Sequence, residues 1–221
     1  MLEIWGRKNS SNVIPVMWTV AELGLEHQRY NVGGSFGGDD SETYRLMNPN
    51  GLIPTISDHG FVLWESMAIT RYLCRKHGMG TLCPEDPQQA ALAEQWIEWY
   101  KSSITPSLMP IFFNLVRTPA PEQDAALIKQ CLAATISYLQ TLEQHLQGQS
   151  YILGDSFSMA DIPLGAMMYK FFKLAIERPS LPNIEAWYAR LCERPAYQTH
   201  AMIAFGSSPE EWLELEIAGA R

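Results

Sequence analysis

The chain has 221 residues, of which 47% are hydrophobic, so it can fill one large core or two small ones. Sixteen basic residues face twenty-four acidic ones, which gives a formal net charge of −8 and a pI near 5.1. This balance argues against nucleic acid or an anionic membrane surface as the main partner. No apolar run reaches the roughly 18 residues of a membrane-spanning helix, and the first residues do not resemble a signal peptide. We therefore expect a cytoplasmic protein.

The first part of the chain alternates between strand and helix patterns. In chain order the sequence predicts a strand at residues 2–5, a helix at 13–23, a strand at 28–32, a short helix at 41–47, a hairpin at 55–63 and a helix at 67–77. Ser11 or Asn12 is placed to cap the helix at 13–23, and Pro15 falls in its first turn, where the missing N–H costs little. This order of elements fits a thioredoxin-like α/β sandwich.

The remainder of the chain shows only helix patterns. The expected helices lie around residues 92–100, 132–146 and 184–192. Thr105-Pro106 is expected to bend or end the first of them. Ser158 to Asp161 form a capping motif at the start of a further, buried helix, which gives Asp161 a structural role. The tail from Gly206 onward looks loosely specified.

The cysteines show no pattern of a metal or redox site. They are Cys74, Cys83, Cys131 and Cys192. No two of them form a Cys-x-x-Cys pair, and no histidine lies at metal-ligand spacing from them. We expect four reduced, structural thiols and no bound metal.

The most informative stretch is Asn-Pro-Asn-Gly-Leu-Ile-Pro-Thr-Ile at residues 48–56, with Glu65-Ser66 after the hairpin. Turn residues and a proline interrupt a strand pattern here, and Ser66 can cap the helix that follows. Free backbone amides at such a cap attract a carboxylate, while Glu65 beside them would hold an ammonium group. An α-amino acid carries both charges on one carbon and fits this pair. A plain strand-turn-helix without a ligand is the alternative.

These residues resemble the glutathione-binding segment of the glutathione S-transferase superfamily. The family pattern runs Asn-Pro-x-Gly-x-aliphatic-Pro, then Glu-Ser-x-Ala-Ile and Tyr-Leu, and every fixed position is present in this chain. The resemblance implies that Pro54 is cis and that the backbone of Ile53 binds the cysteinyl unit of glutathione. It likewise implies that Glu65 and Ser66 hold the γ-glutamyl end.

The resemblance also implies a fold and an assembly. It predicts an α/β thioredoxin-like domain at residues 1–82 that binds glutathione, and an all-α domain at residues 87–221 that contributes the electrophile pocket, with a linker at 83–87. It further implies a homodimer that acts on glutathione, as co-substrate, and a small apolar electrophile.

The group that activates the thiol of glutathione should lie at the mouth of the first helix, within residues 9–12. A free thiol has a pKa near 8.5 and is largely protonated at neutral pH. Lowering that pKa by about two units requires about 2.7 kcal/mol, and one hydroxyl hydrogen bond to an anion supplies about 1.5–3 kcal/mol. One serine at this position is therefore sufficient.

Two family patterns place this group on different residues. In serine-type members, the theta-like ones among them, the activating serine lies six residues before an aliphatic helix position that is Val16 here, which selects Ser10. In other bacterial, nu-like members an asparagine two residues further on has the role, and Asn12 occupies that place. Ser11 is a third candidate. Each of the three could instead serve only as a helix cap.

The chain departs from other patterns of the family at defined positions. Trp5 stands at the end of the first strand, where tyrosine-type members carry tyrosine, and no cysteine precedes Cys74, as the cysteine-type pattern would require. Leu52 occupies a position where many relatives carry Lys or Arg. A contact with the glycine carboxylate of glutathione is therefore expected to be missing, with weaker affinity as a consequence.

The expected electrophile pocket uses large apolar side chains of the helical part. Helical spacing selects Met109, Phe112, Phe113, Tyr169 and Phe172. Met109 and Phe113 rank first because they follow the expected bend at Pro106. The same stripe of residues would also suit a plain core, so both interpretations remain open.

Three functions are consistent with this sequence. The first is a glutathione transferase in which Ser10 stabilises the thiolate for attack on an apolar electrophile. The second is a glutathione-dependent disulfide reductase or peroxidase that uses Asn12. The third is a non-catalytic binding protein of the same fold.

Overall fold

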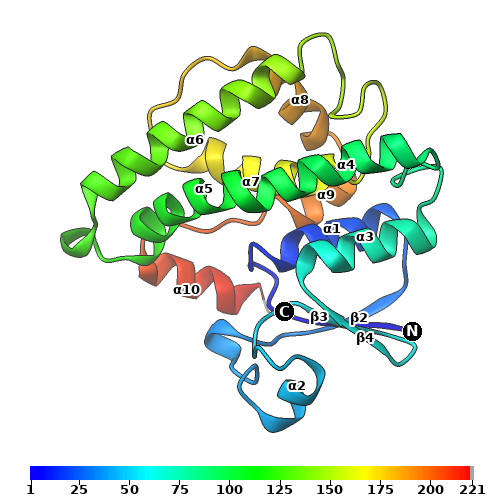
Figure 1. The fold of residues 1–221 in the computed structure, drawn as a ribbon. Helices are drawn as coiled ribbons and strands as arrows, with labels where there is room; N and C mark the ends of the chain where they lie inside the picture. The colour runs from blue at the N-terminus through cyan, green and yellow to red at the C-terminus, as the bar shows by residue number, and fades with distance from the viewer. Residues whose placement is uncertain (220–221) are drawn as a thin grey trace.

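The computed structural model describes residues 1–219, and its N-terminal part is built on a four-stranded sheet (Figure 1). The strands are β1 (Leu2–Trp5), β2 (His27–Tyr30), β3 (Thr55–Asp58) and β4 (Phe61–Trp64), in the order β2-β1-β3-β4. β1 runs parallel to β2 and antiparallel to β3, and β3 and β4 form the predicted hairpin. Its two turn residues, His59 and Gly60, have φ values of 53° and 90°, as a twisted two-residue hairpin turn requires.

Helices cover this sheet because their apolar stripes match its inner face. They are α1 (Val13–Glu22) and α3 (Ser66–His77), while η1 (Gly34–Phe36) and α2 (Glu42–Met47) lie in the connection from β2 to β3. Ile4, Ile56, Val16 and Ile69 from four of these elements are fully buried together. The predicted thioredoxin-like arrangement is therefore confirmed.

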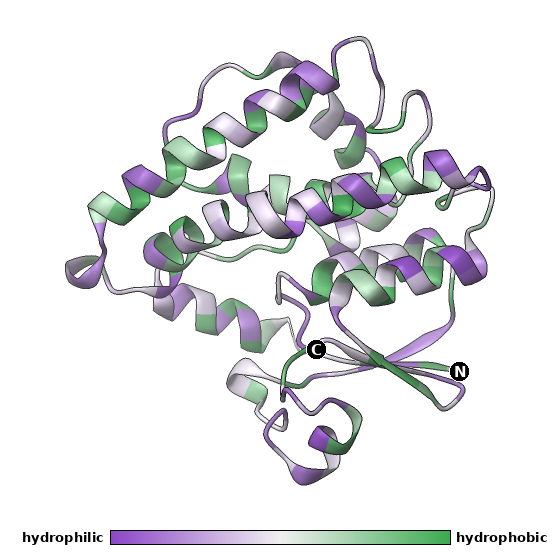
Figure 2. Ribbon diagram, viewed as in Figure 1, coloured by the Kyte–Doolittle hydropathy of each residue, from purple (hydrophilic) through white to green (hydrophobic). Residues whose placement is uncertain are grey.

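Helices make up the rest of the described chain, as the sequence predicted. They are α4 (Pro87–Trp99), η2 (Tyr100–Ile104), α5 (Thr105–Phe112), η3 (Phe113–Arg117), η4 (Ala120–Glu122), α6 (Ala125–His145), α7 (Asp161–Lys173), α8 (Pro182–Cys192), α9 (Pro195–His200) and α10 (Pro209–Ala218). Most of them carry both hydrophilic and hydrophobic residues along their length, as amphipathic helices do (Figure 2). Within residues 1–219 no helix is long and apolar enough to cross a membrane.

The helical path does not end at Thr105-Pro106, so of the two expected outcomes, a bend or an end, the second is wrong. α4 continues through the wider π turns of η2 into α5, so that the three form one long rod in Figure 1. The N–H of Thr105 bonds to the carbonyl of Tyr100, five residues earlier. A wider turn makes room for the Pro106 ring, which would otherwise meet the carbonyl of the preceding turn.

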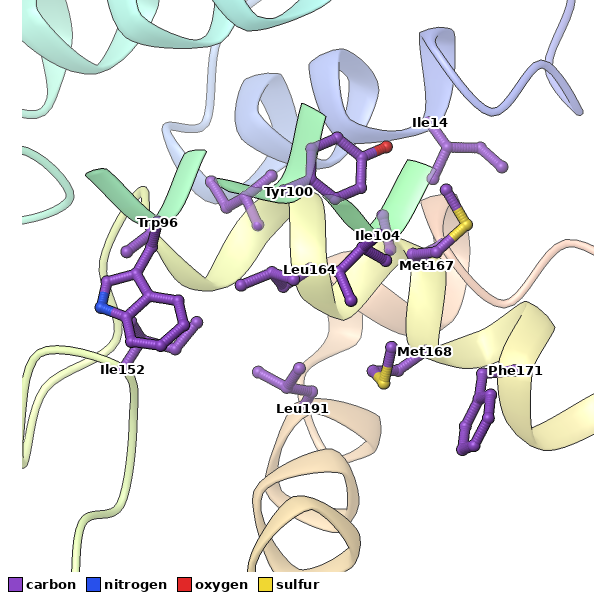
Figure 3. Packing of buried hydrophobic residues seen from close by; sticks show 14 of the residues in the cluster. Ile14, Trp96, Tyr100, Ile104, Ile152, Leu164, Met167, Met168, Phe171 and Leu191 are labelled. Carbon is purple, nitrogen blue, oxygen red and sulfur yellow. The ribbon is translucent and has the colours of Figure 1, made fainter. Parts of the chain in front are cut away.

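The helical core is centred on α7, which is buried along most of its length. Figure 3 shows Ile104, Leu164 and Leu191 from three different elements gathered in one cluster. At the start of α7, Asp161 is fully buried, and its Oδ1 accepts hydrogen bonds from the N–H of Ile152 and from Nε1 of Trp187, both at 2.9 Å. Burial outweighs these bonds and raises the pKa of Asp161 to about 6. The structural role predicted for this residue is confirmed.

Residues 207–219 include the regular helix α10, so the expectation of a loosely specified tail is wrong for this part, while residues 220–221 lie outside the described chain. Ser208 caps α10 by accepting the N–H of Glu211 at 3.2 Å, and Pro209 occupies the first position of the helix. Trp212 and Glu216 are buried. In Figure 1, α10 lies between the helical part and the loop that follows β2.

Candidate active site

A cavity of about 500 Å³ lies between the sheet-containing part and the helices. Its lining brings together ten of the residues selected from the sequence: Ser10, Ser11, Asn12, Ile53, Pro54, Glu65, Ser66, Met109, Phe112 and Phe113. Tyr169 and Phe172 do not line it. Tyr169 packs against Phe205 at 6.0 Å between ring centroids, and Phe172 stacks on Tyr188 at 4.5 Å. On α7 it is Met167 that reaches the cavity instead.

The loop between β1 and α1 directs one hydroxyl group at the cavity. Ser10 is 7% exposed, and its Oγ accepts the backbone N–H of Asn12 at 3.3 Å. Its carbonyl accepts the N–H groups of Val13 and Ile14, both at 2.9 Å. Within residues 1–219 no hydrogen bond uses the hydroxyl proton of Ser10 as donor, so this proton is free to point at a ligand.

Neither Ser11 nor Asn12 caps α1 with its side chain, which corrects that expectation. Asn12 occupies the cap position, but with φ −88° and ψ −26° it already has helical geometry. A capping side chain needs an extended backbone to reach back to the helix amides. The side chain of Asn12 is exposed and that of Ser11 half-buried, and both residues line the cavity.

The peptide bond between Ile53 and Pro54 is cis, as the resemblance implied. In the described part of the chain neither the N–H nor the C=O of Ile53 has a backbone partner. The preceding carbonyl, that of Leu52, is held by Tyr44 Oη and by Asn48 Nδ2, both at 2.7 Å. The segment is therefore rigid and still leaves one free donor and one free acceptor, which an extended peptide can pair with.

Glu65 and Ser66 form the start of α3, one residue earlier than predicted. Ser66 is the first helical residue and not the cap, and Glu65 takes the cap position without a side-chain hydrogen bond. The backbone of Glu65 has φ 71° and ψ 114°, a conformation that residues other than glycine rarely adopt and that often marks a functional site. Its carboxylate is about half exposed and lies 3.9 Å from Nζ of Lys101.

Arg7, Arg117 and Trp212 also line the cavity and were not selected from the sequence. Nη1 of Arg7 lies 2.8 Å from Oδ1 of Asn9 and 3.2 Å from Oε2 of Glu216, whose Oε1 accepts the N–H of Ser35 at 2.9 Å. Burial lowers the pKa of Arg7, and the Glu216 carboxylate partly offsets this. The signal that could have predicted α10 is the pair Ser208 and Glu211, three residues apart, a capping box with proline between them.

The protein's own thiols lie away from this cavity. All four cysteines are free, and none lines it. Burial raises the pKa of Cys74 to about 12, so this thiol is not a nucleophile at neutral pH. Among residues 1–219, no group of three or more His, Cys, Asp or Glu side chains could hold a metal ion.

Comparisons with known proteins agree with this geometry. Residues 9–76 match the family model described as Glutathione S-transferase, N-terminal domain, and residues 104–195 match that described as Glutathione S-transferase, C-terminal domain. The chain is 35% identical over 205 residues to glutathione S-transferase GstB of Escherichia coli K12, which covers 92% of this chain and 99% of that protein. It is 31% identical over 206 residues to glutathione S-transferase 3 of Zea mays, with 89% and 91% covered.

Among solved structures, one similar fold is the theta class glutathione S-transferase from the citrus canker pathogen Xanthomonas axonopodis pv. citri, crystallised with glutathione bound. Its TM-score to this chain is 0.89 at 43% sequence identity, and the match covers 93% of this chain and 99% of that one. With both parts of the fold, the cavity between them and these relatives in agreement, the chain belongs to the glutathione S-transferase family.

Proposed function

We propose that this glutathione transferase activates the thiol of glutathione through Ser10 and directs it at an apolar electrophile. In this proposal the cysteinyl unit of glutathione pairs with the free N–H and C=O of Ile53, as a short β-strand would. The γ-glutamyl carboxylate lies at the first amides of α3 near Ser66, and its ammonium faces Glu65.

The observation that carries the proposal is the free hydroxyl proton of Ser10. Because Oγ already accepts the N–H of Asn12, the hydroxyl is oriented and its proton is left for an acceptor in the cavity. A thiolate is such an acceptor, and one hydrogen bond to an anion contributes about 1.5–3 kcal/mol. That is enough to lower the pKa of the bound thiol by about one to two units.

The chemical step then needs no cofactor. The thiol releases its proton to solvent, the sulfur forms a bond to the electrophilic carbon, and the leaving group departs with its electron pair. Met109 and Phe113 offer apolar surface for the electrophile, and Phe113 is 43% exposed in the described chain. Phe112 lies behind them, 1% exposed, and supports this surface.

Asn12 supports a second candidate, the disulfide reductase or peroxidase. Its side chain lines the cavity and makes no capping hydrogen bond, so its amide is free to hold a thiolate. In that function the thiolate of glutathione attacks a disulfide or a peroxide and not a carbon electrophile. A non-catalytic protein of this fold would bind glutathione without accelerating either reaction.

Three single variants separate these functions. Ser10→Ala should lower the rate of conjugation of a neutral aryl halide about tenfold to a hundredfold near pH 7, with glutathione affinity within a few-fold of wild type. Ser11→Ala is the matched control, since it removes a neighbouring hydroxyl. If Asn12→Ala lowers the rate and Ser10→Ala does not, Ser10 is not the activating residue. Disulfide reduction, measured on the same proteins, tests the second function.

We also propose a homodimer. The edge strand β4 exposes Phe61, Val62 and Trp64 at 51%, 38% and 36%, an apolar strip that a second subunit would cover. Light scattering at micromolar concentration should give twice the mass of one chain, and a monomer would contradict the proposal. The division at residues 82 and 87 and the cytoplasmic location remain predictions.

A further inference from the structure

Three cationic side chains, those of Arg7, Lys101 and Arg117, line the cavity, although the chain as a whole carries a net charge of −8. Arg7 and Lys101 line the cavity with acidic partners, Glu216 at 3.2 Å and Glu65 at 3.9 Å. Arg117 also lines it, and within residues 1–219 it has no ion pair. Arg117 is therefore the cation of the described cavity lining that has no ion-pair partner.

Aromatic rings fix the position of the Arg117 guanidinium. Its central carbon lies 5.4 Å from the ring centroid of Phe113 and 5.2 Å from that of Trp212. A guanidinium that stacks on rings keeps its N–H groups free in one plane for a carboxylate. Arg117 is exposed to solvent, so an anion can reach it.

Lys170 adds a second unpaired cation behind the cavity wall. It is 3% exposed, and its Nζ lies 5.3 Å from the ring centroid of Phe112, which lines the cavity. In the described chain Nζ forms no ion pair, and the charged group that acts on it is Arg7. Burial, with Arg7 nearby, lowers the pKa of Lys170 to about 8, so most of it is still charged at pH 7. A buried cation without a counter-ion is costly unless an anion approaches it.

We propose that the preferred electrophile carries an anionic group, a carboxylate, next to an apolar body. The inference rests on the proposed transferase function and refines its substrate class. The apolar body of the electrophile lies against Met109 and Phe113, and its carboxylate pairs with Arg117. Lys170, which lies against the ring of Phe112, raises the positive potential near that carboxylate. Asp39, which also lines the cavity, interacts with Arg7 and therefore opposes this potential only in part.

The alternative role for Arg117 is to hold the glycine carboxylate of glutathione, since Leu52 supplies no charge for it. The contacts of Arg117 point to the electrophile instead. Both of its ring partners belong to the helical part, and in the described chain no hydrogen bond or ion pair joins Arg117 to residues 48–66. The Arg117→Gln variant distinguishes the two assignments.

The test compares 4-chloro-3-nitrobenzoate with the matching 4-chloro-3-nitrobenzamide, which differ in charge at the same position. In both, the sulfur of glutathione displaces chloride from the ring. Each kcat/KM is divided by the uncatalysed rate constant with glutathione at the same pH, so that intrinsic reactivity cancels. We expect wild type to prefer the benzoate about tenfold, as one charge-assisted contact provides. No preference for the benzoate would overturn the inference.

Variants locate the source of the preference. Arg117→Gln should remove most of it, and Lys170→Met should reduce it about two- to fivefold, while Lys129→Gln, an exposed lysine on α6, should leave it unchanged. If Lys170→Met fails to fold, Lys170→Gln and the salt dependence of the preference in wild type take its place. An Arg117→Gln protein with intact preference but a raised KM for glutathione would assign Arg117 to the glycine carboxylate and overturn the inference.

The same experiment separates this inference from the proposed function. If the benzamide is conjugated faster than in the uncatalysed reaction and the benzoate is not preferred, only the inference fails. If neither compound is conjugated, the proposed function fails and the inference with it. Competition by 3-nitrobenzoate and 3-nitrobenzamide, which have no leaving group, gives an independent readout, and the benzoate should inhibit at the lower concentration.

Discussion

The two sides of the cavity are built in different ways. The thioredoxin-like side uses Ser10 in the loop before α1, Ile53 just before β3 and Ser66 at the start of α3, and it presents backbone groups and one hydroxyl. The helical side uses large side chains such as Met109 of α5 and Trp212 of α10, which are far apart in the sequence. The first side therefore depends on local backbone geometry, and the second on how helices pack.

This difference suits two tasks. The thioredoxin-like side holds one peptide in one orientation, and the helical side forms a wall that can vary between proteins. Backbone pairing and helix N-termini can hold one peptide in one orientation whatever the neighbouring side chains are. A wall of side chains from α5, η3 and α10 changes with every substitution. Glu216 is the exception, because it belongs to α10 but binds Ser35 and Arg7 of the other side.

The largest expected effect concerns the stability of the helical side. Asp161→Ala leaves the buried donors of Ile152, Ser158 and Trp187 without an acceptor, at about 1–3 kcal/mol each, partly relieved by relaxation. Urea unfolding should show a loss of about 3–5 kcal/mol. Asp161→Asn keeps one acceptor oxygen and should lose less. A loss below about 1 kcal/mol for Asp161→Ala would contradict the structural role.

The second prediction concerns Glu216, which connects the two sides of the cavity. Glu216→Ala leaves the side chain of Arg7, 12% exposed, without its acidic partner, and should lower the free energy of unfolding by about 3 kcal/mol. Glu214→Ala, exposed on the same helix, is the control and should stay within about 0.5 kcal/mol of wild type. A double-mutant cycle with Arg7→Met should show coupling, and strict additivity would mean that the pair does not join the two sides.

The third prediction concerns Glu65, on the thioredoxin-like side, and its contribution to glutathione affinity. Because the Glu65 side chain is 54% exposed, water screens its charge, and Glu65→Ala should weaken glutathione binding by about 1–2 kcal/mol, or about 5- to 30-fold. Calorimetry measures this directly. Glu98→Ala serves as the control, since it removes an exposed carboxylate outside the cavity lining. Unchanged affinity in Glu65→Ala would mean that the γ-glutamyl end lies elsewhere.

The smallest effect concerns Asp58, the buried carboxylate of the sheet. Burial alone would raise its pKa, but hydrogen bonds from Lys76 at 2.6 Å, from His59 and from Tyr72 outweigh it and lower the pKa below the usual range. A lowered folded pKa contributes stability above about pH 4 that is lost as the pH falls further. Asp58→Asn should therefore be about 1 kcal/mol less stable than wild type at pH 7. This difference in stability should shrink between about pH 4 and pH 2. A difference that stays constant over this range would show that the ionised carboxylate of Asp58 does not stabilise the fold.

Most of the thioredoxin-like side could be predicted from the sequence because its signals are local. Strand alternation, the turn at His59-Gly60 and the spacing of Glu65 and Ser66 all act within a few residues. The predictions that were wrong concern the starts of α1 and α3, which depend on exact dihedral angles. Ser66 became the first helical residue because Glu65 adopts a positive φ, and Asn12 does not cap because its backbone is already helical.

The helical side was predicted less completely because its composition depends on tertiary packing. Helical spacing gives a stripe of residues but not its direction, so Tyr169 was selected although Met167 faces the cavity. Pro106 was expected to bend or end a helix, and a π turn carries the helix past it. The role of Trp212 depends on the position of α10, which no local pattern fixes.

The pKa of glutathione's thiol in the complex tests the central claim most directly. Thiolate absorbance, titrated against pH in wild type, Ser10→Ala, Ser11→Ala and Asn12→Ala, measures it without any electrophile. We expect a pKa about one to two units below the free value of about 8.5 in wild type and Ser11→Ala, and a return toward 8.5 in Ser10→Ala. A pKa that stays low in Ser10→Ala and rises in Asn12→Ala would contradict it and would assign thiol activation to Asn12.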